Sequence, residues 1–165
     1  MRLLATLVFL LLGGCGYQFG GASLPGDVRV VHIAQPRNLT LEPLLETHLG
    51  RPLAAQLGKQ PHIRLANTPE GAEAVLATEV VDYQVEPISY SVADRISAFQ
   101  ATLVVRFFLK RQPGGEVLWQ DEVRRQGNYS AATDKNLQED LESAQQQVLA
   151  DDIATDMVQH LITRF

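Results

Sequence analysis

Cys15 is the residue whose chemistry is easiest to assign. It is the only cysteine among the 165 residues, so no internal disulfide can form. A thiolate is a nucleophile, and a lone thiol is therefore available for covalent modification. Cys15 directly follows Gly13 and Gly14, which in turn follow an apolar run. This setting favours modification of Cys15 over a catalytic role.

Residues 1–14 have the layout of a secretory signal. One cation, Arg2, precedes the apolar run of residues 3–12, and small residues lead to Cys15. The run is shorter than the roughly 20 residues that a membrane-spanning helix needs. The Leu-Gly-Gly-Cys ending resembles the bacterial lipobox, although its second position is usually Ala, Ser, Thr or Val. We therefore predict a cleaved signal peptide and lipidation of Cys15, the alternative being an ordinary cleaved signal.

Three cations form a second candidate site: Arg106, Lys110 and Arg124. They belong to two strands predicted over 98–112 and 116–128, and strand alternation places all three on the same face. Apolar Val104, Phe108 and Leu118 share that face, with Thr102, Gln120, Glu122 and Gln126. Cations among apolar side chains suit an amphiphile with an anionic head group, or a protein partner with aromatic and acidic walls. The alternative is that helices cover both faces of the sheet.

Residue patterns for catalysis, metals or cofactors are not found in the sequence. The four histidines are widely spaced, whereas a zinc site needs clustered ligands; they are His32, His48, His62 and His160. No nucleophile elbow or phosphate-binding loop occurs. The net charge of −5 argues against a general role on nucleic acids. We therefore expect no enzyme, no metal, no cofactor and no nucleic-acid partner.

The first half of the chain predicts a tether, a strand and a helix. Glycines and a proline make residues 15–27 a flexible tether, and residues 28–165 follow as one domain. The β-branched stretch 28–33 predicts a strand. Leucines recur every fourth residue over 41–57, with Pro43 in the expected first helical turn. Gly50 and Pro52 predict a kink or a break within this helix.

The second half predicts a hairpin between further strands and a long helix. Residues 62–66 are an uncertain strand. Residues 74–85 predict a strand whose imperfect alternation indicates a bulge or burial on both faces. Residues 87–96 predict a loop in which Tyr90 is a candidate interface residue. The apolar stripe over 134–165 predicts a helix, capped by Asn136 or Asp134. The predicted order is β-α-(β)-β-β-β-α.

Burial fixes the register of the hairpin. A three-residue loop at Pro113-Gly114-Gly115 sets Gln112 opposite Glu116, Leu109 opposite Trp119 and Val105 opposite Val123. Arg106 then faces Glu122, and Phe107 faces Asp121. A two-residue loop would set apolar residues against polar ones, because a slip of one residue turns every side chain to the opposite face.

Several short motifs, in this order and spacing, resemble the LptE family of lipopolysaccharide-assembly lipoproteins. They are Cys-Gly-Tyr-Gln-Phe at 15–19, Leu-Pro-Gly-Asp-Val at 24–28, Ala-Glu-Ala-Val-Leu at 72–76 leading to Asp82-Tyr83, and Gly-Glu-Val-Leu-Trp at 115–119. The resemblance covers most of the chain beyond the signal. It implies an α+β fold, a two-layer sandwich of a mostly antiparallel sheet of four strands, with a fifth possible, and two helices.

The resemblance also implies a function and partners. LptE-family proteins plug a large outer-membrane β-barrel of the LptD type, assist its assembly and help to insert lipopolysaccharide into the outer leaflet. The chain would be anchored to the outer membrane, on its periplasmic side, through acylated Cys15. Under this hypothesis Arg106, Lys110 and Arg124 bind the lipopolysaccharide phosphates. The alternatives are a pilotin-like or barrel-assembly helper and, less favoured, a lipid-anchored hydrolase.

Overall fold

The computed structural model describes residues 24–163. The predicted signal peptide, Cys15 and most of the predicted tether lie outside the described residues. The regular elements, in chain order, are η1 (Pro25–Asp27), β1 (Val30–Ile33), β2 (Arg37–Asn38), α2 (Leu45–Gly58), β3 (Arg64–Leu65), η2 (Pro69–Gly71), β4 (Ala74–Tyr90), β5 (Ile96–Arg111), β6 (Val117–Ser130) and α3 (Lys135–Thr163). The two α-helices and the sheet confirm the predicted α+β class.

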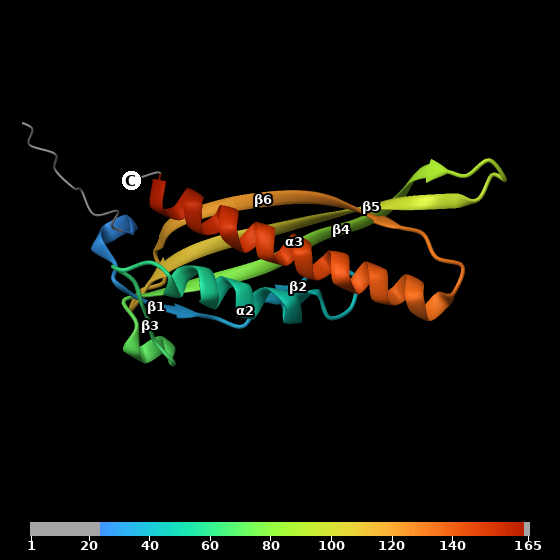
Figure 1. The fold of residues 1–165 in the computed structure, drawn as a ribbon. Helices are drawn as coiled ribbons and strands as arrows, with labels where there is room; N and C mark the ends of the chain where they lie inside the picture. The colour runs from blue at the N-terminus through green and yellow to red at the C-terminus, as the bar shows by residue number, and fades with distance from the viewer. Residues whose placement is uncertain (1–23, 164–165) are drawn as a thin grey trace, which may run out of the picture.

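The strands form one mixed sheet, shown along its length in Figure 1. Their order is β3-β1-β4-β5-β6, and β2 also pairs with β4. The long strands β4, β5 and β6 are antiparallel, whereas β1 runs parallel to both β3 and β4. The sheet thus has six strands where the sequence predicted four or five. β3 is the strand that the sequence left uncertain over 62–66, and β2, only two residues long, was not predicted.

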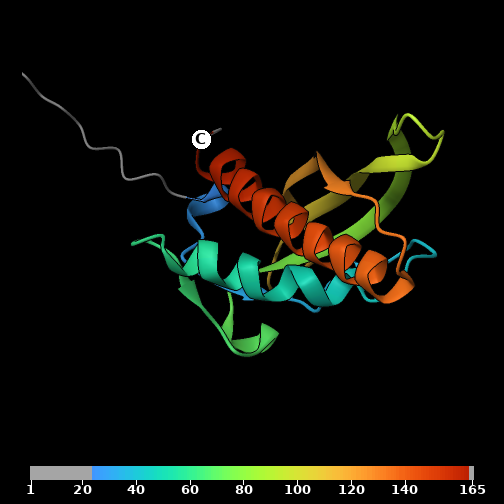
Figure 2. The ribbon, with the colours of Figure 1, turned by 45° about the vertical axis from the view of Figure 1, so that its right-hand side comes forward.

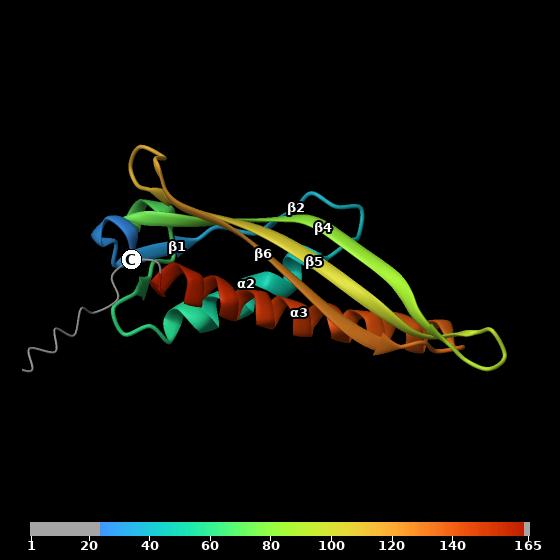
Figure 3. The ribbon, with the colours of Figure 1, turned by 90° about the horizontal axis from the view of Figure 1, so that it is seen from above.

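Both α-helices cover the same face of the sheet. Figure 3 shows α2 and α3 on one side of the strands, and in Figure 2 they cross in front of them. We call the covered face the inner face and the opposite one the outer face. Inner-face residues such as Leu103, Val105 and Phe107 are fully buried, as are Ile153 and Met157 of α3. The core therefore lies between the two layers, as predicted, and the alternative of helices on both faces is wrong.

The register of the β5–β6 hairpin is the predicted one over most of its length. Leu109 pairs with Trp119, Val105 with Val123 and Phe107 with Asp121. Near the turn a register shift follows Leu109, so the Arg111 N–H donates to the Glu116 carbonyl and Gln112 is not opposite Glu116. The bulge predicted in β4 is also present, between Val80 and Asp82.

Half of the predicted loop over 87–96 is strand. β4 continues to Tyr90, β5 begins at Ile96, and these two residues pair. The hairpin loop is therefore only residues 91–95. Pro87 cannot donate a backbone hydrogen bond. It is tolerated because no described strand pairs with this edge of β4 beyond Val80. The result is a long β4–β5 hairpin that projects beyond the helices (Figure 1).

Three other expectations need correction. The first long helix begins at Leu45 rather than near Thr40, because Leu44 has the left-handed φ of 68°, which a right-handed helix cannot contain. The helix continues through Pro52 without a break, and Pro52 and Leu53 are both buried. The folded domain begins before residue 28, because Leu24 is only 2% exposed.

The long C-terminal helix has a side-chain cap at its start. Asp134 accepts a hydrogen bond from the Leu137 N–H at 2.9 Å, and the Gln138 side chain accepts one from the Ala132 N–H at 2.7 Å. Asp134 is thus the capping residue, rather than Asn136. From this cap α3 runs back across β5 and β6, so its packing holds the hairpin that carries the three candidate cations.

Candidate functional site

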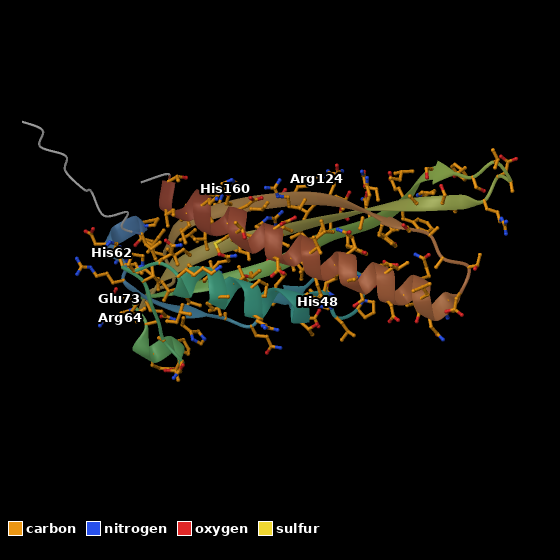
Figure 4. All side chains as sticks on the ribbon, in the orientation of Figure 1. His48, His62, Arg64, Glu73, Arg124 and His160 are labelled. Carbon is orange, nitrogen blue, oxygen red and sulfur yellow. The ribbon has the colours of Figure 1, made fainter. Side chains whose placement is uncertain are left out.

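The outer face of the sheet carries the three cations predicted from the sequence, and two of them are neighbours. Arg106 and Lys110 lie on β5, Arg124 on β6, and Figure 4 shows Arg124 on its strand. The register sets Arg124 opposite Val104 and Glu122 opposite Arg106, so Arg106 and Arg124 are diagonal neighbours, with Cβ atoms within about 7–8 Å. Lys110 lies four residues farther along β5, about 13 Å away.

A row of alternating charges crosses four strands of this face. The register aligns Arg37 with Glu79, Glu79 with Arg106, and Arg106 with Glu122. Arg37 contacts Glu79 at 3.3 Å, and Arg106 contacts Glu122 at 3.0 Å. The Arg106 and Glu122 side chains remain 44% and 52% exposed. Arg106 is therefore partly neutralised, yet still accessible to an external anion.

Lys110 and Arg124 have different surroundings from Arg106. The Lys110 ammonium lies over the Phe108 ring, 5.3 Å from its centre, which is a cation–π contact. Arg124 is exposed, and no ion pair to it is present among residues 24–163. Val104 beside it is only 7% exposed. The apolar surface that this face offers beside its cations is therefore mainly the partly exposed Phe108.

The other hairpin arginines, Arg111 and Arg125, have partners within the fold. Arg125 forms an ion pair with Asp156 of α3, whose carboxylate raises the pKa of the guanidinium. Arg111 contacts Glu116 at 3.5 Å. Strand alternation sets both on the face opposite to Arg106 and Arg124. Arg125 is thus paired with a residue of α3, and Arg111 with a residue next to the β5–β6 turn.

Sequence reasoning missed two features near this site. Arg37 was not a candidate, because β2 is too short to give a hydropathy pattern. The end of the β4–β5 hairpin exposes a group of apolar side chains: Ile88, Tyr90, Val92 and Ile96. Tyr90, 61% exposed, was a predicted interface residue, but its place at the tip of a long hairpin was not predicted. The alternation of Ile88 and Tyr90 was the available signal.

The histidines do not gather into one site. Figure 4 shows His48, His62 and His160 well apart, and no group of three or more possible metal ligands occurs among residues 24–163. His160 contacts Asp121 at 2.6 Å. His48 lines a small pocket of about 250 Å³ together with Ser143, Glu139 and Glu142, but no hydrogen bond in the described part of the chain joins His48 to any of them.

Helices able to cross a membrane are likewise not found: neither α2 nor α3, nor any other helix within residues 24–163, combines the necessary length and apolar character. α3 is long, but only one of its sides is buried.

Comparison with solved structures identifies several proteins of similar fold. A protein of Xanthomonas campestris superposes with a TM-score of 0.59 at 12% identity, covering 87% of this chain and 89% of its own. Lipoprotein B of Nitrosomonas europaea gives a TM-score of 0.53 at 18% identity, with coverages of 90% and 88%. A minor lipoprotein of Acinetobacter baumannii gives 0.51 at 16% identity, with coverages of 82% and 92%. These identities are low, so the likeness concerns the fold.

Sequence comparison assigns the family. A search of curated protein sequences returned no match. By contrast, the family described as lipopolysaccharide-assembly, LptE, matches residues 28–165, which include all six strands and both α-helices. This match agrees with the short motifs found along the sequence. The chain is therefore a member of the LptE lipopolysaccharide-assembly family.

Proposed function

We propose that this protein is an outer-membrane lipoprotein that plugs and helps to assemble an LptD-type β-barrel, and that it assists insertion of lipopolysaccharide into the outer leaflet. The family match over residues 28–165 carries this proposal. The protein acts by binding rather than by catalysis. Its acylated Cys15 holds it on the periplasmic side of the outer membrane, since several acyl chains give stable anchoring.

The outer face supports a direct role in binding lipopolysaccharide. An amphiphile with phosphate groups requires cations next to apolar surface, and the partly exposed Phe108 lies between Arg106 and Lys110 on β5. The phosphates would form charge-assisted hydrogen bonds with the guanidinium groups. Acyl chains or sugar rings would cover the apolar side chains. Because both helices pack on the inner face, ligand binding at the outer face requires no rearrangement of the core.

Charge reversal tests this site. The variant in which Arg106, Lys110 and Arg124 are all replaced by Glu should bind lipopolysaccharide at least tenfold more weakly, because three attractive contacts become repulsive. Binding is measured with the full-length protein in detergent, by displacement of a fluorescent lipopolysaccharide. Circular dichroism and urea unfolding verify that the variant is folded.

A matched control reverses three exposed cations of the helical layer, Arg51 of α2, Lys59 at its end and Lys135 of α3. That variant should retain the affinity of the unmodified protein. Unchanged lipopolysaccharide binding by a folded triple variant, or equal losses in the two variants, would remove the outer face from the proposal.

A further inference from the structure

One edge of β4 is left open for half of its length. On this side β1 pairs with β4 only at Ala74–Leu76 and β2 only at Glu79–Val80. The last backbone contact is the Leu39 N–H donating to the Val80 carbonyl at 2.9 Å. Beyond it, no described strand pairs with this edge of β4. Open strand edges present backbone donors and acceptors to any chain that can add a strand.

The segment after β2 turns away from β4 and is fixed in that path. The Asn38 side chain donates to the Glu42 carbonyl at 2.7 Å and accepts from the Thr40 N–H at 3.0 Å. These bonds close a tight turn and direct Leu41 outward, where it is fully exposed. Leu39 in the same turn is 52% exposed. The chain thus stops covering β4 at a defined point and leaves apolar side chains beside the open edge.

A groove of about 490 Å³ lies along this open edge. It is lined by Thr40, Leu41, Glu42, Val81, Asp82, Tyr83, Val85 and Glu142. Leu41, Val81 and Val85 supply apolar surface. The far end of the usable edge is at Pro87, which has no N–H. Over residues 81–86, the edge of β4 that faces away from β5 is therefore unpaired and lies beside a groove that can receive side chains.

The charge of the groove is acidic. Three carboxylates line it, from Glu42, Asp82 and Glu142, and its lining includes no lysine or arginine. Two of these carboxylates are held in place: Tyr83 donates to Glu142 at 2.9 Å, and Gln146 donates to Glu42 at 3.3 Å. The groove is therefore complementary to a cationic segment.

We propose that the open edge of β4 over residues 81–86 binds an extended, lysine- or arginine-bearing segment of another protein as an added strand. The backbone of that segment pairs with β4, in line with β2 and beyond its end. Its apolar side chains pack on Leu41 and Val85, and its cations contact Asp82 and the two fixed carboxylates. This inference concerns the edge of the sheet and is independent of lipopolysaccharide binding at the outer face.

A peptide probe tests the proposal. A short, fluorescently labelled peptide of alternating lysine and valine is titrated with the full-length protein in detergent, and binding is followed by anisotropy. We expect saturable binding, and we expect it to be lost when alternate peptide amides are N-methylated, since methylation removes the backbone donors. The Asp82→Lys variant should bind the unmethylated peptide about fivefold more weakly, because a cross-strand attraction becomes a repulsion.

The control variant is Glu70→Lys, which makes the same change of charge at an exposed position in η2. It should bind the peptide like the unmodified protein. Circular dichroism establishes that both variants are folded. The proposal is overturned if the peptide does not bind, if the N-methylated peptide binds equally well, or if the Asp82→Lys and Glu70→Lys variants lose the same affinity.

Discussion

Glu122 limits how strongly Arg106 can hold an external anion. The two side chains are 3.0 Å apart and about half exposed, and exposed ion pairs of this kind contribute about 0.2–1 kcal/mol. An incoming phosphate must compete with Glu122 for Arg106. Replacing Glu122 with Gln removes that competition and one local negative charge. The variant should therefore bind lipopolysaccharide more tightly, by about 1.5- to 5-fold.

The same displacement assay with full-length protein measures this gain. It should be greatest at low salt and shrink as the ionic strength rises, since both side chains are reached by counterions. A matched control is Glu116→Gln, which removes the partner of Arg111 near the turn and should leave the affinity unchanged. The decisive comparison is Glu122→Gln made in an Arg106→Gln background, where the gain should vanish.

Two results would refute this reasoning. Weaker or unchanged binding by Glu122→Gln would mean that Arg106 does not contact the ligand. An equal gain in the Arg106→Gln background would mean that the loss of negative charge, and not the release of Arg106, improves binding. Urea unfolding should show little change in stability, because the lost pair is exposed.

Three further predictions concern the fold that positions the site. Phe107→Ala should lower the free energy of unfolding by about 3–5 kcal/mol, because Phe107 is fully buried between the layers; Leu41→Ala, at a fully exposed position, should change it by less than about 0.5 kcal/mol in the same urea titration. Gly26→Ala should cost about 1–2 kcal/mol, since Gly26 has a φ of 71° and an added Cβ would meet the Arg111 guanidinium; a melting temperature equal to that of the unmodified protein would contradict this. The Arg29 and Val30 N–H groups donate to the Glu73 carboxylate at 2.7 and 3.1 Å, and these hydrogen bonds lower its pKa below the ordinary value of 4.5. The ionised carboxylate therefore stabilises the folded state fully above pH 4.5. This stabilisation is lost as the pH falls through the lower folded-state pKa. Glu73→Gln should therefore be less stable at pH 7 and lose less of its stability on acidification, which urea titrations between pH 7 and 3 would measure.

The hairpin and its cations were predictable because burial penalises any other register. Pairing Val105 with Val123 and Leu109 with Trp119 satisfies both strands, and this register also sets Arg106 opposite Glu122. The same alternation set Arg106 and Arg124 on the outer face, whereas the register shift after Leu109 was not predicted. Such predictions succeed where neighbouring strands are long, joined by a short turn, and buried on one face only.

Other features depend on contacts between distant segments. β2 has two residues and is defined only by its partner, so no local pattern reveals it or Arg37, whereas β3 lies within the uncertain strand predicted over 62–66. The side covered by the helices could not be decided either, since an apolar stripe on a helix fits either face of a sheet. The start of α2 depends on the left-handed conformation of Leu44, which a leucine rarely adopts.

The most direct test of the proposed role is to identify the membrane partner. The tagged, lipidated protein is purified from detergent-solubilised outer membranes, and its partners are identified by mass. The account predicts recovery of one LptD-type β-barrel in a one-to-one ratio. Recovery of the protein alone, or with a secretion channel, would contradict it.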